Sequence, residues 1–403
     1  MRVLTFTSLF PNRVKPVHGI FVYQRMSHFA RRPGNSVVVV APVPYFSSWL
    51  RRSKRECVPR QEQVGNLPAY HPRYPLIPKV SMPLHGWLMF LGSFSLVRRL
   101  HRQHKFDVID AHYVYPDGFA AVLLGAFLGL PVVVSARGTD INLFPSFRLI
   151  RPMIRYTLGK ASAVVAVSAS LRNAMLSLGL TPDKVGVIGN GVDLERFFPL
   201  ELSTARSRLN LPQDAQIAVS VGGLVEAKGH QYLVAALGSI VDRYPNLRAY
   251  IVGEGPLRAK LQSMIQAGGL QDHITLVGAQ ANEDLKFWYN AADVTVLTSS
   301  REGWPNVILE SLACGTPVIA TGVGGVPEVI VSPELGVIVE QTAHSVACGL
   351  ETAFQRKWDR VFIERYARHR TWDRVAAELE QWFNTHLGVG SGVQASTAAE
   401  NFS

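Results

Sequence analysis

Short runs of β-branched residues alternate with helical patterns along almost the whole chain. Two series of such runs occur, at residues 3–7, 36–40, 108–111, 132–135 and 163–168, and at 217–221, 247–252, 274–277, 294–298 and 318–321. Strands that are apolar throughout are buried on both faces, which favours parallel sheets covered by helices. The sequence therefore predicts an α/β protein with two doubly wound, Rossmann-like domains.

The two series are separated by the turn-forming residues Gly189-Asn-Gly191. Because 403 residues suit two domains of about 150–200 residues each, we expect a first domain at 1–190 and a second at 191–370. A helical pattern follows at 371–387, and the small, polar residues 388–403 predict a disordered tail. Ligands of doubly wound sheets bind at the carboxyl ends of the strands. The two domains are therefore expected to face each other across a cleft.

The composition is that of a globular protein, with 47% hydrophobic and 18% charged residues. Its three cysteines, Cys57, Cys314 and Cys348, are far apart, which argues for a reducing compartment and against a disulfide framework or a zinc site. The first twelve residues lack a cleavage site and suit a first strand, so a cytoplasmic location is expected. The longest apolar stretch, Met82–Val97, contains Pro, His and Gly and is shorter than the ~20 residues that span a bilayer.

The formal net charge is +11, with basic clusters at residues 51–55 and 98–102. The second cluster directly follows the apolar stretch, a combination that suits peripheral binding to an anionic membrane, here the inner face of the plasma membrane. A buried helix with a solvated basic end is an equally good interpretation. We see no basic strand interleaved with aromatic residues and no recognition-helix pattern, so no nucleic-acid partner is expected.

Residues 299–317 carry the strongest functional signal. The pattern predicts a strand, a tight turn and a helix that stops at Gly315, and Pro305 suits the first helical position. The turn and the helix start comprise Gly303, Trp304, Pro305 and Asn306. Free N–H groups and the positive end of a helix meet there, as a phosphate requires. Glu302 and Glu310 flank this point. A carboxylate repels a phosphate, so we expect these two to accept hydrogen bonds from hydroxyl groups instead. A sugar nucleotide would satisfy all of these groups.

This run resembles the E-x7-E signature of the retaining glycosyltransferases of family 4, which have the GT-B fold. The pattern continues through Thr316–Ala320, Gly324-Gly325 and Pro327-Glu328. The resemblance implies that Glu302 holds hydroxyls of the transferred sugar and that Glu310 holds those of the ribose. The alternative is an exposed Glu302 and a solvated helix face at Glu310.

A second glycine-rich turn follows a strand and opens a helix at residues 219–230. Gly222 and Gly223 would let a diphosphate approach the backbone, and Lys228 would neutralise it. The segment is similar to one in the family where an arginine and a lysine grip the donor diphosphate, but the arginine position is Gly223 here. Either Lys228 and backbone N–H groups suffice, or another cation substitutes.

Three further donor-side positions are suggested by the resemblance. Gly253 lies in a turn near the family's donor site, although the turn lacks the third glycine of a dinucleotide fingerprint. Backbone groups around Val277 would meet the nucleobase. Gly19 resembles the glycine that lets the N-terminal loop close on the donor phosphates.

In the first half, His112 ends a strand, and Arg137 and Asp140 follow the next one. Family members commonly carry His where this chain has Arg137, and Asp140 matches the family's aspartate. Arg137 could supply the cation missing at Gly223, because a guanidinium binds phosphate oxygens in bidentate fashion, or it could contact the acceptor. Strand-end His and Asp residues are also often turn caps.

The resemblance covers residues 1–385 and implies a retaining transferase without metal or other cofactor. Its donor would be a nucleotide-diphosphate sugar, and its acceptor a saccharide or polyprenyl-linked saccharide of bacterial surface-polysaccharide synthesis. Glu302, Lys228, His112, Arg137 and Asp140 are the candidate catalytic residues. Two alternatives stay open: a sugar-nucleotide epimerase on the same fold, and a catalytically silent sugar-nucleotide-binding subunit.

Overall fold

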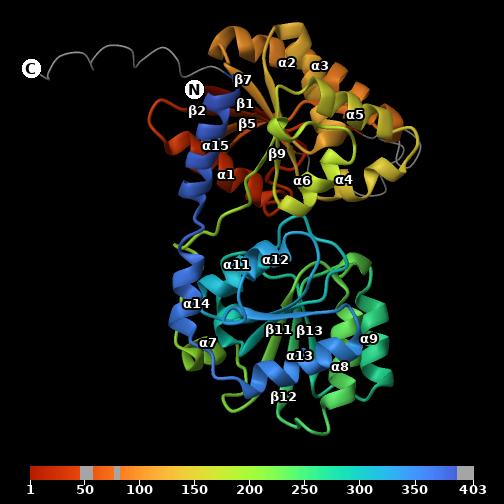
Figure 1. The fold of residues 1–403 in the computed structure, drawn as a ribbon, viewed down its shortest axis with the longest axis vertical. Helices are drawn as coiled ribbons and strands as arrows, with labels where there is room; N and C mark the ends of the chain where they lie inside the picture. Colours follow the sequence, from red (N-terminus) through yellow and green to blue (C-terminus); the bar gives the residue numbers. More distant parts are fainter. Residues whose placement is uncertain (46–57, 77–81, 388–403) are drawn as a thin grey trace, which may run out of the picture. The chain divides into compact units, whose positions relative to one another are not determined.

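The computed structural model describes residues 1–45, 58–76 and 82–387 (Figure 1). The chain divides into two units, one formed by Met1–Gly189 with Trp372–Ser403 and one by Asn190–Thr371. The predicted tail at 388–403, the basic cluster at 51–55 and Cys57 lie outside the described residues. No helix in the described ranges is both long and apolar enough to cross a bilayer.

The first unit is built on an eight-stranded sheet in the order β10-β9-β8-β7-β1-β2-β5-β4. Its strands are β1 (Arg2–Phe6), β2 (Ser36–Val40), β4 (Gln61–Val64), β5 (Leu67–Tyr70), β7 (Val108–His112), β8 (Val132–Ala136), β9 (Ala163–Ala166) and β10 (Val185–Val187). All neighbours pair in parallel except β4 and β5. A separate two-stranded sheet joins β3 (Val43–Tyr45) to β6 (Arg73–Pro75).

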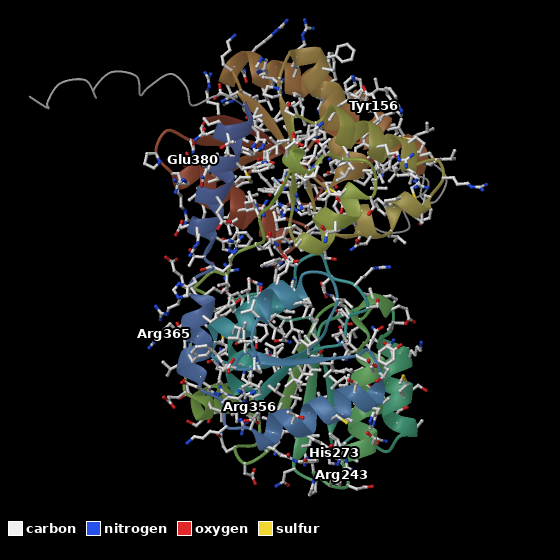
Figure 2. All side chains as sticks on the ribbon, viewed as in Figure 1. Tyr156, Arg243, His273, Arg356, Arg365 and Glu380 are labelled. Carbon is white, nitrogen blue, oxygen red and sulfur yellow. The ribbon has the colours of Figure 1, made fainter. Side chains whose placement is uncertain are left out.

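Helices cover this sheet. They are α1 (Ile20–Arg31), α2 (His85–His104), α3 (Phe119–Leu128), α4 (Thr139–Asn142), α5 (Arg151–Lys160), α6 (Ala169–Leu176) and α15 (Trp372–Leu387). The last of them comes from the end of the chain and packs beside α1 (Figure 1). Phe383 of α15 meets Phe29 of α1 with ring centroids 5.7 Å apart. Glu380, labelled in Figure 2, accepts a hydrogen bond from Arg32 at 2.6 Å. The helix therefore completes the core of the first unit.

The second unit has a six-stranded, all-parallel sheet in the order β13-β12-β11-β14-β15-β16. The strands are β11 (Gln216–Val221), β12 (Leu247–Val252), β13 (Ile274–Gly278), β14 (Val294–Leu297), β15 (Val318–Thr321) and β16 (Gly336–Val339). The helices are α7 (Leu202–Arg208), α8 (His230–Ile240), α9 (Arg258–Ala267), α10 (Leu285–Ala291), α11 (Asn306–Ala313), α12 (Val326–Val329), α13 (Ala343–Gln355) and α14 (Arg360–Ala367). Counted from β11, the spatial order is 3-2-1-4-5-6, the order of dinucleotide-binding folds.

Alternate residues of each central strand enter different cores. Val219 and Val221 of β11 pack in one cluster and Ala218 in another, on the opposite face of the sheet. Strands buried on both faces are what their continuous apolar runs predict. The predicted pair of doubly wound α/β folds is thus confirmed.

Candidate functional site

The strand order of the second unit reverses between β11 and β14, and such a switch point is where doubly wound sheets bind ligands. The loops that leave these two strands are joined there. Thr298 Oγ1 donates to the carbonyl of Gly229 at 2.9 Å, and Ser300 N donates to that of Ala227 at 2.9 Å. The two glycine-rich turns singled out in the sequence therefore meet at one point.

Lys228 and Glu302 form an ion pair at this junction. Lys228 Nζ lies 2.5 Å from Glu302 Oε1, and Ser299 Oγ donates to the same oxygen at 2.6 Å. The Lys228 side chain is 26% exposed and that of Glu302 is 10% exposed. A cation and a carboxylate at the mouth of a phosphate-type turn can separate when a diphosphate and a hydroxyl-rich ring take their places.

The candidate glycines have different local roles. Gly253 has φ 150°, and a Cβ there would lie 1.9 Å from the carbonyl oxygen of Gly222, so only glycine fits. Gly222 itself donates to the carbonyl of Val252 at 2.9 Å. At Gly223, by contrast, a Cβ would meet only the Glu254 carbonyl oxygen, at 3.8 Å. The position where the family carries arginine therefore has room for a side chain.

Helix α11 begins at Asn306, so Pro305 precedes the first helical residue and does not occupy it as predicted. Its φ of −86° and ψ of 80° place Pro305 at the N-cap. Asn306 Oδ1 accepts a hydrogen bond from Asn190 Nδ2 at 3.0 Å, which ties the helix start to the first residue of the unit. Trp304 is partly buried against the core.

Glu310 lies one turn further along α11, partly exposed. Tyr289 Oη donates to its Oε2 at 2.8 Å. Burial of the carboxyl raises the pKa of Glu310 to about 7, against the opposing effects of the Tyr289 hydrogen bond and the Arg196 charge. A carboxylate with one polar partner and a pKa near neutrality is poised to accept further hydrogen bonds.

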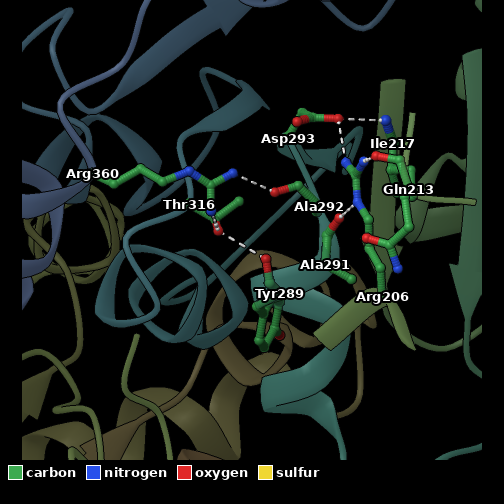
Figure 3. Close-up of polar contacts among 9 residues, drawn as sticks. All are labelled: Arg206, Gln213, Ile217, Tyr289, Ala291, Ala292, Asp293, Thr316 and Arg360. Atoms are coloured by element: carbon green, nitrogen blue, oxygen red, sulfur yellow. Dashed lines mark hydrogen bonds and ion pairs between the residues drawn. The ribbon is translucent and has the colours of Figure 1, made fainter. Parts of the chain in front are cut away.

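A buried network holds Tyr289 in place (Figure 3). Its carbonyl accepts a hydrogen bond from Thr316 Oγ1 at 2.8 Å. Two carbonyls shortly after it in the chain also accept hydrogen bonds: that of Ala291 from Arg206 at 3.0 Å and that of Ala292 from Arg360 at 2.7 Å. The position of the Glu310 partner is thus fixed from α7 and α14, two helices that carry none of the predicted site residues.

Val277 lies in β13, the edge strand of the second sheet. Strand β12 separates β13 from β11, which borders the switch point. The strand end next to it is joined to the neighbouring turn, because Gly253 N donates to the Gly278 carbonyl at 2.9 Å. Val277, Gly253, Gly222 and Lys228 therefore follow one another across adjacent strand ends of the same sheet.

In the first unit, His112 at the end of β7 lies between the carboxylate of Asp110 and the guanidinium of Arg137. His112 Nε2 lies 2.9 Å from Asp110 Oδ2, without hydrogen-bond alignment, and the Arg137 guanidinium donates to His112 Nδ1. Since Arg137 can only donate, Nδ1 accepts, and the proton of a neutral imidazole is then on Nε2, facing Asp110. Burial, aided by the Arg137 charge, lowers the pKa of His112 to about 4 despite Asp110. The ring is neutral at pH 7.

Asp140 organises the loop that carries Arg137. Its carboxylate, fully buried, accepts hydrogen bonds from the N–H groups of Val114 at 2.8 Å, Gly138 at 2.8 Å and Arg137 at 3.1 Å. Asp140 therefore caps a turn, which was one of the two roles that the sequence analysis left open for it. Asp140 acts by holding the backbone of Arg137, whose guanidinium also lies 5.2 Å from the ring centroid of Phe21.

Gly19 precedes α1 with φ 66°, and a Cβ there would lie 2.3 Å from the Leu9 carbonyl. The loop before α1 is closed on itself at this point, and Ser8 Oγ donates to Asp117 Oδ2 at 3.1 Å. Burial raises the pKa of Asp117 to about 7.

Sequence reasoning assigned no site role to Asp117 or to Asp110. The available signal for Asp110 was an acidic residue inside an otherwise apolar strand.

Family models match most of the chain. Residues 203–370 match "Glycosyl transferases group 1" and residues 19–196 match "Glycosyltransferase Family 4". Bacillus subtilis (strain 168) TuaC, a glycosyltransferase named for teichuronic acid biosynthesis, is 29% identical over 98% of this chain and 97% of its own. A D-inositol 3-phosphate glycosyltransferase of Thermomonospora curvata is 31% identical over 77% of this chain and 78% of its own.

Solved structures show the same fold. Sucrose-phosphate synthase of Thermosynechococcus elongatus is 22% identical with a TM-score of 0.75, over 95% of this chain and 98% of its own. HepE of Anabaena in complex with UDP and glucose is 17% identical with a TM-score of 0.72, over 95% of this chain and 99% of its own. On these matches, the chain belongs to the group 1 glycosyltransferases and has their GT-B fold of two Rossmann-like domains.

Proposed function

We propose that this chain is a retaining, metal-independent hexosyltransferase that uses a nucleotide-diphosphate sugar. The observation that carries the proposal is the Lys228–Glu302 ion pair at the switch point, with Glu310 about one turn into the helix α11 that follows. These groups together suit a diphosphate between two hydroxyl-bearing rings. The UDP complex of HepE, a structural neighbour, supports a donor of this class.

In the reaction, Lys228 leaves Glu302 and binds the diphosphate of the donor. The freed Glu302 carboxylate accepts a hydrogen bond from a sugar hydroxyl, while Glu310 accepts from the ribose. As the bond between sugar and diphosphate breaks, Lys228 and the start of α11 stabilise the negative charge that develops on the leaving group. Charge stabilisation of this kind needs no divalent ion. Retention of configuration is proposed from the E-x7-E pattern.

The acceptor we propose is a saccharide or a polyprenyl-linked saccharide of bacterial cell-surface polysaccharide synthesis. The name of TuaC, which matches nearly the whole chain, supports this class of pathway. Arg137, held by Asp140 and neutral His112, contributes a cation from the first unit.

Peripheral contact with an anionic membrane at the cytoplasmic face is part of the proposal. Trp87 and Leu91 of α2 are 45% and 66% exposed, and Phe127 of the adjacent α3 is 69% exposed. Arg98 lies on the same helical face as Leu91, seven positions away. Tyr156 of α5, labelled in Figure 2, is 42% exposed and packs on the buried Phe119 with ring centroids 5.8 Å apart, and Trp87 packs on the same ring at 5.2 Å.

Two measurements test these proposals. A thermal-shift screen of nucleotide sugars should find one base and sugar that raise the melting temperature, and product analysis with that donor should show a new glycosidic bond only when acceptor is added. Conversion of the donor alone into its epimer would contradict transfer. For the membrane, the Trp87→Ser/Leu91→Ser protein should sediment less with phosphatidylglycerol vesicles than the parent, and equal sedimentation would remove this surface from the proposal.

A further inference from the structure

The first unit contains a cavity of about 360 Å³ that none of the functions above uses. It lies at the end of β5, between β4, β6 and the middle of α2, and its volume is within the range of ligand pockets. The lining residues are Arg60, Gln61, Tyr70, His71, Pro72, Arg73, Gly92, Leu96 and Arg99. Because β5 runs parallel to β2, this is the carboxyl edge of the sheet, the edge at which β7 and β8 present His112 and Arg137.

Three of the lining side chains are arginines from three separate segments of the chain. Arg60 precedes β4, Arg73 lies in β6 and Arg99 in α2, and all three are exposed. Among the described residues, no acidic one lines the cavity, and none of the ion pairs found there includes any of the three arginines. Three guanidinium groups around one cavity repel one another unless an anion lies between them.

The carboxylate of Glu62, the residue after the lining residue Gln61, is engaged elsewhere. Glu62 Oε1 lies 2.8 Å from His71 Nε2, and its Oε2 accepts from the backbone N–H of Arg13 at 3.2 Å. His71 in turn contacts the carbonyl of Ala41 through Nδ1 at 3.0 Å. The wall of the cavity that His71 forms is therefore held by hydrogen bonds, while the arginines of the other walls have no carboxylate partner in the described part of the chain.

A glycine lets the basic residues approach one another. A Cβ at Gly92, in the middle of α2, would lie 2.8 Å from Tyr74 Cβ and 2.9 Å from the Arg73 carbonyl. Glycine inside a helix reduces helix stability, and here its absence of side chain brings α2 against β6. Arg99, seven positions after Gly92 on α2, lines the same cavity as Arg73.

We propose that this cavity binds a phosphate or diphosphate group of the acceptor. A guanidinium matches phosphate oxygens in bidentate geometry, and three of them suit a group with more than one negative charge. Gln61 and Tyr70 offer hydrogen bonds to adjoining hydroxyls, and Leu96 offers an apolar wall. The identification of this anion as part of the acceptor rests on the transfer reaction proposed above, whereas anion binding itself does not.

Titration calorimetry with inorganic pyrophosphate tests the site. The experiment uses the full chain with Lys228→Ala, so that the donor site does not contribute its cation. Arg99→Gln should weaken pyrophosphate binding about tenfold or more, as expected for a lost charge-assisted hydrogen bond, and Arg73→Gln/Arg99→Gln should abolish it. Arg98→Gln is the matched control, since it removes the same charge one residue away, outside the cavity, and should leave binding unchanged. Equal effects of Arg98→Gln and Arg99→Gln would overturn the proposal.

A second arm distinguishes the source of the phosphate. Farnesyl diphosphate that binds more tightly than pyrophosphate, with the same dependence on Arg99, would assign the site to a lipid diphosphate. Equal affinity would assign it to the anion of a water-soluble acceptor. Circular dichroism of each variant shows whether it is folded. Because no sugar is transferred in these titrations, their outcome is independent of the donor screen, and failure of either proposal can be recognised separately.

Discussion

Lys228 Nζ and Glu302 Oε1 lie 2.5 Å apart although the two residues are 74 positions apart in the chain. Each was selected from the sequence for a different task, one for the diphosphate and one for the sugar. The cation and the carboxylate thus neutralise each other in this structure. In the reaction proposed above, donor binding replaces this contact with two new ones.

Opposite effects on nucleotide affinity are predicted for the two members of this pair. Lys228→Gln should weaken binding of the nucleoside diphosphate by about tenfold to a hundredfold, because a charged hydrogen-bond donor is lost. Glu302→Gln should bind it as tightly as the parent or more tightly, since Lys228 is no longer held, yet should lower the rate of sugar transfer. Calorimetry and an initial-rate assay measure the two quantities. Weaker nucleoside diphosphate binding by Glu302→Gln would contradict competition for Lys228.

Glu310→Ala is predicted to weaken donor binding by roughly 1.5–3 kcal/mol, the contribution of a hydrogen bond to a charged group. Tyr289→Phe is a matched variant, since it removes the 2.8 Å hydrogen bond to Glu310 and leaves the carboxylate. It should have a smaller effect on donor affinity. Unchanged nucleotide affinity in Glu310→Ala would show that the ribose role is wrong.

The pKa of Glu310, about 7, predicts a pH dependence of donor binding. A ribose hydroxyl donates to the ionised carboxylate, so binding requires the deprotonated form. Affinity for the nucleotide sugar should therefore fall as the pH is lowered through 7, by about tenfold per pH unit well below the pKa. Glu310→Gln, which has no ionisable group, should show a flat profile between pH 6 and 8. A parent profile equally flat would contradict the assignment.

Transfer is predicted to survive EDTA, because Lys228 and the start of α11 supply the positive charge at the diphosphate. The measurement is the rate of product formation after dialysis against chelator, compared with the rate after magnesium or manganese is added back. A complete loss that either ion reverses would show that the reaction needs a metal.

The family carries an arginine at the position of Gly223. If Arg137 replaces that cation, Arg137 and residue 223 are predicted to be energetically coupled. Arg137→Ala should then be severe in the parent and milder in a Gly223→Arg background. The structure makes the second variant feasible, since a Cβ at Gly223 has only one neighbour, at 3.8 Å. A double-mutant cycle on kcat/KM should give a coupling of roughly 0.5–3 kcal/mol. Additive effects would leave Arg137 on the acceptor side.

The sequence predicted most of the second unit because its signals are local. Most of the predicted strands there are apolar runs followed by a glycine turn and a helix, as at Val219–His230, whereas the edge strand β16 was not predicted. The edge of the first sheet was missed for the same reason. In β4 the residues are Gln-Glu-Gln-Val, and β5 contains Pro68, which argues against a central strand.

The contacts within the site could not be predicted in this way. The Lys228–Glu302 pair and the His112–Arg137 contact join residues whose distance depends on strand order. Strand order is set by the packing of whole helices and not by any one segment. The single residue pattern that could have suggested Asp110 is its position two residues before His112 in a buried strand, where both side chains point to the same face.

The C-terminal helix has a consequence for how the protein is made. Residues 190–371 form a continuous unit, whereas the first unit lacks α15 until residues 372–387 have been synthesised. Val375, Leu379 and Phe383 pack in the same core as Val3 and Val39. On a ribosome, the later unit can thus finish folding while the earlier one still waits for its last helix. A nascent chain released just before residue 372 would carry a finished second unit joined to an incomplete first unit with an open hydrophobic core.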